Sequence, residues 1–378
     1  MKTSFLKTGL SHLLTRRAGF PVKALAAAII GGLVAGKLLA QSVVWSGQDA
    51  AVNSNTNWSA VNNWTGGTPG PATNICFFDA GMNPAPGAPD NLVDGVTAIA
   101  SLQYGNTNGF HTTQINPGVK LTVTNSGAVN LVFVGTGTDN GANQTVAAAM
   151  TGAGTLTVSS TNSASLFVVQ QGSTNNGSHM ATLDLTGLAT FNLTAGRLMI
   201  GSANPGSGGY NWLSGSLYLA KTNTLRVNGA APAIDEGDSS GNGGTSYFYL
   251  GQTNAIFADT LTIAHSKATG TWAFNPAFAG SNPMLTLNGN TNSLTAVLAI
   301  GDFSAQSTSG STTFGTADFT GGTVTALVDT CYVGRGQTGS GSGPTTGALR
   351  LGSGLWNVNT LNVGYVSASS ALAASPAA

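Results

Sequence analysis

Charged side chains are scarce in this chain, and glutamate is almost missing. Lys, Arg, Asp and Glu make up 7% of the 378 residues, and the one glutamate is Glu236. A glycosidase that uses two glutamates is therefore excluded, and only pairs that contain aspartate remain. After residue 40 the histidines are His111, His179 and His265, and none has a second histidine at zinc-ligand spacing. This spacing argues against a zinc site, and we expect a protein without enzymatic activity.

Cysteine is nearly absent as well. The two cysteines, Cys76 and Cys331, stand far apart in the sequence. In an elongated repeat structure they would lie too far from each other to form a bond, so a disulfide framework is not expected. We expect both to be buried free thiols that act as small apolar side chains.

Acidic residues are missing from the first 40 positions. Six of the 13 Lys and Arg residues lie there, together with an apolar run from Ala24 to Ala35. A run of about 12 residues fits the apolar core of a secretory signal peptide and is short for a membrane span. We expect residues 1–40 to be a signal peptide that is cleaved after Ala40, with an uncleaved membrane anchor as the alternative.

The remainder of the chain is acidic. Residues 41–378 hold seven basic residues against 13 acidic ones, a formal charge of −6. Nucleic acid is not expected as a partner, because phosphate binding requires a cationic face. We expect a secreted or cell-surface protein with no transmembrane segment after cleavage.

Sustained helical periodicity is also missing, and Gly interrupts almost every window. The hydrophobic content of 41% is too high for a typical disordered chain. It is arranged in short runs in which apolar residues alternate with Thr, Asn or Arg, the pattern of a strand with one buried face. These runs contain Leu, any residue, then Val, Ile or Leu: KLTV (120–123), TLTV (155–158), TLRV (224–227), TLTI (260–263), MLTL (284–287) and TLNV (360–363).

A second kind of short run ends in glycine. It occurs as VFVG (132–135), LMIG (198–201), FYLG (248–251), LAIG (298–301) and CYVG (331–334). The closing glycine permits the positive φ of a tight corner. Both kinds of run recur at irregular spacing, so the sequence leaves two all-β folds open.

The preferred fold is a right-handed parallel β-helix, or solenoid, over residues 95–366. Repetition of one strand type favours it, as do outward Thr, Ser and Asn side chains that can stack between coils. No Asn-Gly hairpin loop recurs at fixed spacing between matched strands. Tandem β-sandwich domains, which also have short strands and Gly-rich turns, are the alternative. Residues 367–378 are expected to be a disordered or truncated tail.

Residues 41–94 are rich in tryptophan. Trp45, Trp58 and Trp64 lie within this segment and account for half of the six tryptophans. Repeat proteins need terminal caps that cover the open end of the core, and we expect this segment to be such a cap. The alternative is an aromatic platform on which the three indole rings stack against sugar rings.

One acidic segment, DEGDSSGNGG (235–244), has the composition of a cation site. Asp235, Glu236, Asp238 and Asn242 could supply oxygen ligands to Ca²⁺, although the spacing matches no EF-hand loop. A solvated loop is the competing interpretation. No other cofactor is expected.

Residues 41–366 resemble exported bacterial proteins that carry autotransporter-associated β-strand repeats. The resemblance rests on the W-S-G, N-W-S and N-N-W motifs, on P-G-P before F-F-D, on the strands that end in glycine, and on FTGGTV (319–324). It implies a β-helical passenger-like region with an adhesive or structural role and no catalytic residues. The chain departs from the family at its end, ASSALAASPAA, where an autotransporter would have the strands of a membrane barrel.

Two functions follow as expectations. The first is a non-catalytic extracellular or surface β-solenoid that contacts glycans or cell-surface components. The alternative is a carbohydrate-binding or polysaccharide-lyase-like β-helix. A lyase would need Asp ligands for Ca²⁺ and a basic residue on the same exposed face, so it requires Arg226 to lie beside residues 235–238.

Overall fold

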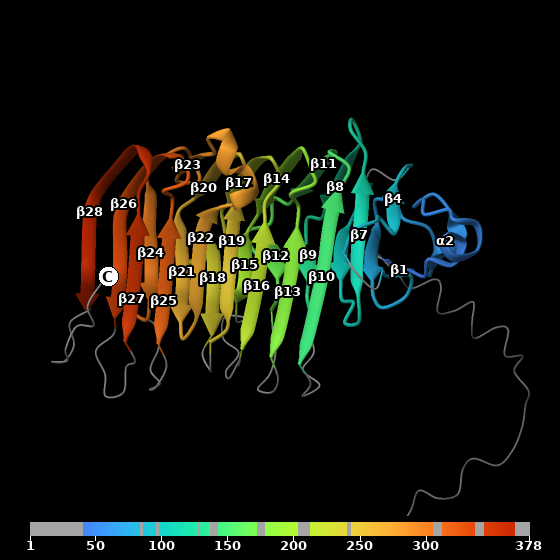
Figure 1. Ribbon diagram of the computed structural model, residues 1–378, viewed down its shortest axis with the longest axis horizontal. Helices are drawn as coiled ribbons and strands as arrows, with labels where there is room; N and C mark the ends of the chain where they lie inside the picture. The colour runs from blue at the N-terminus through green and yellow to red at the C-terminus, as the bar shows by residue number, and fades with distance from the viewer. Residues whose placement is uncertain are drawn as a thin grey trace, which may run out of the picture. The chain divides into compact units, whose positions relative to one another are not determined.

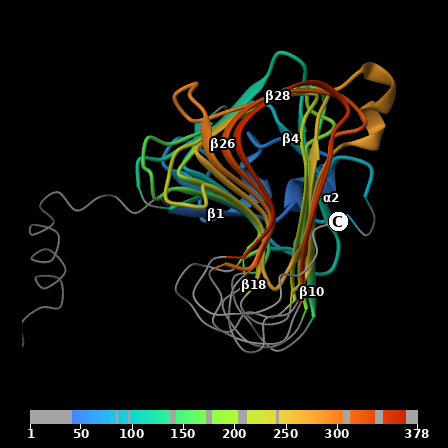
Figure 2. The ribbon, with the colours of Figure 1, turned by 90° about the vertical axis from the view of Figure 1, so that its left-hand side faces the viewer.

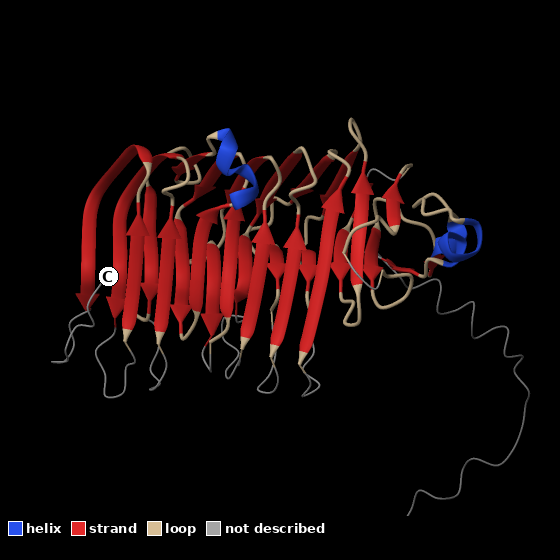
Figure 3. Cartoon of the chain, viewed as in Figure 1, coloured by secondary structure: helices blue, strands red, loops and turns tan. Residues whose placement is uncertain are grey.

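The computed structural model describes residues 41–83, 86–95, 98–127, 129–136, 143–171, 178–202, 212–239, 243–304, 312–336 and 344–366. The expected signal peptide and the expected tail lie outside these residues. Residues 40–378 form one compact unit. Within the described part, strands predominate from one end of the unit to the other, with the short helix α2 (Gln48–Asn53) at the N-terminal end (Figures 1 and 3).

The chain winds in coils, and from residue 110 onward each coil adds one strand to each of three rows (Figure 1). Row 1 contains β4 (Asn91–Val93), β7 (Phe110–Ile115), β10 (Gln144–Thr151), β13 (His179–Asp184), β16 (Leu213–Tyr218), β19 (Thr245–Leu250), β22 (Thr269–Phe274), β25 (Thr313–Asp318) and β27 (Thr345–Arg350). Row 2 contains β5 (Ala98–Ile99), β8 (Lys120–Thr124), β11 (Thr155–Ser159), β14 (Thr190–Ala195), β17 (Thr222–Val227), β20 (Thr253–Ala258) and β23 (Met284–Asn288).

Row 3 lies next along each coil. It contains β6 (Ser101–Tyr104), β9 (Asn130–Val134), β12 (Leu166–Val169), β15 (Arg197–Ser202), β18 (Ile234–Ser239), β21 (Thr260–Ser266) and β24 (Thr295–Asp302). In the last coils rows 2 and 3 fuse into the long strands β26 (Thr323–Gly336) and β28 (Ser353–Val366). The remaining elements are β1 (Gln41–Trp45), β2 (Trp64–Thr65), β3 (Thr73–Phe77), η1 (Val61–Asn63) and η2 (Pro276–Ser281).

Parallel pairing between successive coils decides the fold class. Residue 155 pairs with residue 120 of the coil before and with residue 190 of the coil after, for example. Among the described strands only β1 and β2 pair antiparallel. The chain is therefore a parallel β-helix, as the sequence predicted, and the alternative of antiparallel sandwich domains is excluded. Inward side chains of the three rows form one apolar core from Val43 to Val333.

The irregular spacing of the sequence units has a simple structural cause, because units of one kind come from different rows. TLTI lies in β21 of row 3, whereas KLTV, TLTV, TLRV and MLTL lie in row 2. FYLG lies in β19 of row 1, whereas the other units that end in glycine lie in row 3. Within one row the register is regular from coil to coil.

A column of residues with positive φ runs along row 3. The register of neighbouring strands places these residues one above another: Gly201 (φ 58), Gly237 (φ 66), Ala264 (φ 58), Gly301 (φ 70), Gly334 (φ 75) and Gly364 (φ 65). The corner that a closing glycine predicted is confirmed at Gly201, Gly301 and Gly334. Ala264 adopts the same conformation although a Cβ disfavours it.

The tryptophan-rich segment fills the N-terminal end of the core. Trp45 and Trp58 are fully buried, and Trp64 meets both edge to face at ring-centroid distances of 5.0 and 5.5 Å. The Trp58 Nε1 donates to Asn91 Oδ1 over 2.8 Å, and the Trp64 Nε1 donates to the Trp58 carbonyl. Phe77 packs against all three indoles and begins the continuous core. The expected N-terminal cap is confirmed.

Both cysteines are buried free thiols, which confirms the expectation from their spacing. Burial raises the pKa of Cys76 and raises the pKa of Cys331 to about 12. Because the thiolate is the reactive form, we expect neither thiol to react with Ellman's reagent at mildly alkaline pH in the native state. Both should react after denaturation. Rapid native-state reaction, or fewer than two thiols in denaturant, would contradict this account.

Among the described residues, no helix combines the length and the apolar character that crossing a membrane requires.

Candidate functional site

Rows 1 and 3 approach each other closely at a waist that is lined by glycine. Figure 2 looks along the stack and shows the two rows drawing together toward β10 and β18. On the row 1 side, Gly215, Gly270, Gly315 and Gly347 lie against the positive-φ column of row 3. A Cβ on Gly315 would lie 2.7 Å from the carbonyl oxygen of Ile263 and closer still to the backbone nitrogen of Gly301. At these glycine positions the waist leaves no space for a side chain.

The residues that follow the first five of these positive-φ positions form a polar column at the end of row 3. In register these residues are Ser202, Asp238, His265, Asp302 and Arg335. The Arg335 Nε donates to Asp302 Oδ1 over 3.0 Å, and its guanidinium lies 4.7 Å above the Tyr332 ring. Arg335 thus offsets the charge of Asp302 within the column.

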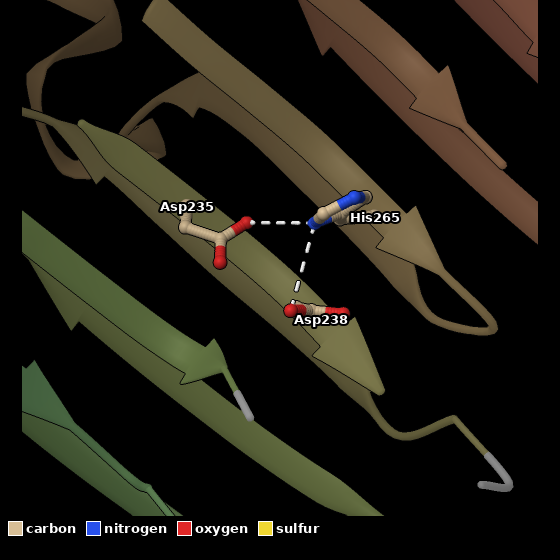
Figure 4. Close-up of side chains that lie close together, drawn as sticks. All are labelled: Asp235, Asp238 and His265. Atoms are coloured by element: carbon tan, nitrogen blue, oxygen red, sulfur yellow. Dashed lines mark ion pairs between the residues drawn. The ribbon is translucent and has the colours of Figure 1, made fainter. Parts of the chain in front are cut away.

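Asp235 converges on one point with two members of this column, Asp238 and His265 (Figure 4). The His265 Nδ1 lies 3.5 Å from Asp235 Oδ1 and 3.5 Å from Asp238 Oδ2. The other oxygen of Asp235, Oδ2, accepts a 2.7 Å hydrogen bond from Ser202 Oγ. Arg197 Nη2 approaches the same Oδ2 at 3.5 Å.

Electrostatics at this cluster are strongly perturbed. Burial acts to lower the pKa of His265, but the charge of Asp238 and contacts with Asp235 outweigh it and raise that pKa well above its usual value. Burial raises the pKa of Asp238, and the negative charge of Asp235 adds to the effect. Such shifts mark sites where ionisable groups are held together despite the cost of desolvation.

One of the four predicted Ca²⁺ ligands, Glu236, lies apart from this cluster. Glu236 follows Asp235 on the strand, so its side chain points to the opposite side, into the core. There its Oε1 accepts a 2.8 Å hydrogen bond from the Thr271 backbone, and burial raises its pKa well above the usual value. Asn242 lies outside the described residues. The structure therefore brings together Asp235 and Asp238 and adds His265, which the sequence analysis did not connect with them.

The three predicted glycan-stacking tryptophans lie in the core. Trp45, Trp58 and Trp64 pack against one another and against Phe77, and none presents a ring face to solvent. The predicted basic residue Arg226 lies on row 2, where its guanidinium stacks 3.8 Å above the Phe257 ring and donates to the Asn290 carbonyl. It does not face the acidic cluster of row 3.

Partly exposed aromatic side chains gather instead on the outer face of row 1. Tyr218 and Tyr249 occupy paired positions on β16 and β19, and their rings stack at 4.7 Å with an interplanar angle of 21°. Tyr247 lies parallel to Tyr249 at 5.7 Å and 4°. Together these three residues form the tyrosine patch. The sequence does contain a signal for this patch: the alternation in YFYL (247–250) places two tyrosines on the same face of a strand.

Trp212 stands beside the tyrosine patch. Its side chain is 49% exposed, and its backbone has a φ of 54°. A large residue in this region stores strain of about 1–3 kcal/mol, and such strain is concentrated at functional positions. Trp212 and Tyr247 line a groove of about 400 Å³ together with Met180, Thr182, Ser214 and Ser216. None of these lining residues is charged.

Comparison with protein-family models, with curated proteins and with solved structures finds no match for this chain.

Proposed function

We propose that this chain is an exported, non-catalytic β-helix that binds neutral polysaccharide through the outer face of row 1. The observation that carries the proposal is the exposed Trp212 beside the stacked tyrosine patch. Aromatic rings with a polar edge combine apolar contact with hydrogen bonding, which suits the C–H faces and hydroxyls of a sugar. Thr182, Ser214 and Ser216 supply hydroxyls along the same groove.

The sheet beneath this face supports the proposal. Tyr218, Tyr247 and Tyr249 stand on strands that are paired on both sides within row 1, so their backbone positions are fixed before a ligand arrives. Groups held in place in this way lose little conformational freedom on binding. Because the groove has no charged lining residue, we expect it to prefer neutral sugars over uronic acids.

A second surface adds to the adhesive role. Row 2 carries an outward column of small residues, each paired with its neighbour in the next coil. All are polar except Ala255: Thr122, Thr157, Asn192, Thr224, Ala255, Thr286 and Thr325. Repeated hydroxyls on a regular sheet can make many weak contacts with an extended polymer. An adhesive role agrees with the resemblance to autotransporter-associated repeat proteins. We propose this relationship as well, together with export through residues 1–40.

A polysaccharide array that includes neutral and acidic polymers tests this function. We expect the purified chain to bind at least one neutral polymer without shortening it. Trp212→Gly and Tyr247→Ala should each weaken binding about tenfold or more, which corresponds to about 1.4 kcal/mol.

Phe314→Ala is the matched control, because Phe314 is an exposed aromatic residue on the same outer face that does not line the groove. It should leave binding unchanged. Binding that is indifferent to Trp212 and Tyr247, silence on every polymer, or cleavage of a polymer would each contradict the proposal.

A further inference from the structure

We propose that Asp235, Asp238 and His265 bind one divalent transition-metal ion, with Zn²⁺ as the ion that suits this ligand set best. Their ligand atoms all lie within 4.8 Å of one another (Figure 4). Two carboxylates and one imidazole supply the oxygen and nitrogen donors that zinc accepts. The site is separate from the groove on row 1, so it stands or falls independently of polysaccharide binding.

Local backbone geometry explains why two aspartates of one strand share a side. Residues three apart on a regular strand point to opposite faces. Between Asp235 and Asp238 the positive φ of Gly237 breaks that alternation and turns Asp238 toward His265. Asp238 and His265 are register partners in adjacent coils, and adjacent parallel strands lie about 4.8 Å apart.

Two atoms at this point lack the hydrogen bond that burial normally demands. The Asp235 side chain is 1% exposed, and neither its Oδ1 nor the Nδ1 of His265 makes a hydrogen bond within the part of the chain that the structure describes. Both atoms are aimed at each other across 3.5 Å. A buried polar group without a partner costs about 1–3 kcal/mol, and an ion between them would satisfy both.

The two distances from His265 Nδ1 match the spacing of ligands around one zinc ion better than the length of a direct hydrogen bond. Two ligands about 2.1 Å from a tetrahedral zinc ion lie about 3.4 Å apart. The two Nδ1–carboxylate separations are both 3.5 Å, whereas a hydrogen bond from nitrogen to oxygen spans about 2.7–3.2 Å. Calcium would need about six to eight oxygen ligands, and the described residues of this cluster offer two carboxylates and a nitrogen.

Surrounding groups orient the site and leave it open. The hydrogen bond from Ser202 fixes Oδ2 of Asp235 and so directs Oδ1 toward His265. Arg197 contacts Oδ2 as well and offsets part of its charge. The side chains of Asp238 and His265 are 14% and 15% exposed, which gives an ion a path from solvent.

Titration calorimetry of the purified full chain, freed of metal by a chelator and carrying no histidine tag, tests the proposal. We expect one Zn²⁺ per chain and a rise in melting temperature when the ion is present. Co²⁺ should give the intense visible absorption of a tetrahedral site. Asp238→Asn and His265→Gln should each weaken Zn²⁺ binding by about 100-fold or more, and Ser202→Ala by about 10–100-fold.

Asp318→Asn is the control, because this aspartate lies on row 1, where its Oδ1 accepts a hydrogen bond from the nearby Thr320 hydroxyl. It should bind Zn²⁺ as the wild type does. Circular dichroism shows whether each variant is folded. We expect Asp238→Asn to fold, because the Asp238 side chain is partly exposed. Absence of Zn²⁺ binding by the folded wild type, undiminished binding by folded His265→Gln, or preference for Ca²⁺ at these residues would overturn the proposal.

Discussion

Replacing Gly315 by alanine is expected to destabilise the chain by about 3 kcal/mol, the upper end of the usual cost of overpacking a buried site. The added Cβ would collide with the backbone of Gly301 and would lie 2.7 Å from the carbonyl oxygen of Ile263. Backbone atoms in paired strands cannot turn aside as a flexible side chain would. Rows 1 and 3 would have to separate at the waist, which also disturbs the neighbouring coils.

Denaturant unfolding followed by circular dichroism measures this effect as a lower transition midpoint. Gly280→Ala is the matched control: Gly280 lies in η2, a Cβ there meets nothing within 4 Å, and the position has no positive φ. Its effect should stay within about 0.5 kcal/mol. A Gly315→Ala midpoint equal to that of Gly280→Ala would show that the waist is not tightly packed.

Loss of Trp58 is expected to cost about 3–5 kcal/mol, the range for removing a large buried aromatic side chain. The side chain is fully buried, and its loss also removes the hydrogen bond to Asn91 and the edge-to-face contact with Trp64. Because each coil of a repeat protein is stabilised by its neighbours, damage to the cap should spread first into the coils beside it.

Hydrogen exchange resolves that spread along the chain. In Trp58→Ala we expect faster exchange in β6 and β9 than in β24, in addition to a lower unfolding midpoint. Trp212→Gly is the control for loss of an indole, since Trp212 is half exposed and its positive φ suits glycine. Equal loss of stability in the two variants, or uniform exchange along the chain, would contradict a capping role for Trp58.

The sequence contained enough information for the fold because each coil repeats the same local rule. Alternation of Leu and Val with Thr defined the strands, and glycines such as Gly301 and Gly334 marked the corners. The regular coil length could not be read from the sequence, because strands with the same pattern occur in different rows. The pattern of a strand does not show to which row it belongs. The positive-φ column of row 3 was also hard to recognise in the sequence, because Ala264 has the corner conformation although it is not a glycine.

The candidate sites were harder to predict because they depend on register. His265 meets Asp235 and Asp238 only because adjacent coils bring β18 and β21 side by side, so no spacing rule within one segment finds the cluster. Glu236 looked equivalent to its neighbours, but the alternation of the strand sends it into the core. The clustering of Trp45, Trp58 and Trp64 in the sequence predicted a ligand-binding platform, but these three indoles are buried. Only an exposed indole can meet a ligand, and Trp212, near the tyrosine patch, is exposed.

Trp212→Gly provides the most direct test of the central claim, that the aromatic face of row 1 binds polysaccharide. Affinity electrophoresis in a gel that contains a neutral polysaccharide bound by the wild type measures retention, and thermal unfolding of the same samples measures stability. We expect the variant to lose retention while its melting temperature stays equal to or above that of the wild type, because glycine relieves the strained backbone. Retention equal to that of the wild type in a folded variant would contradict the central claim.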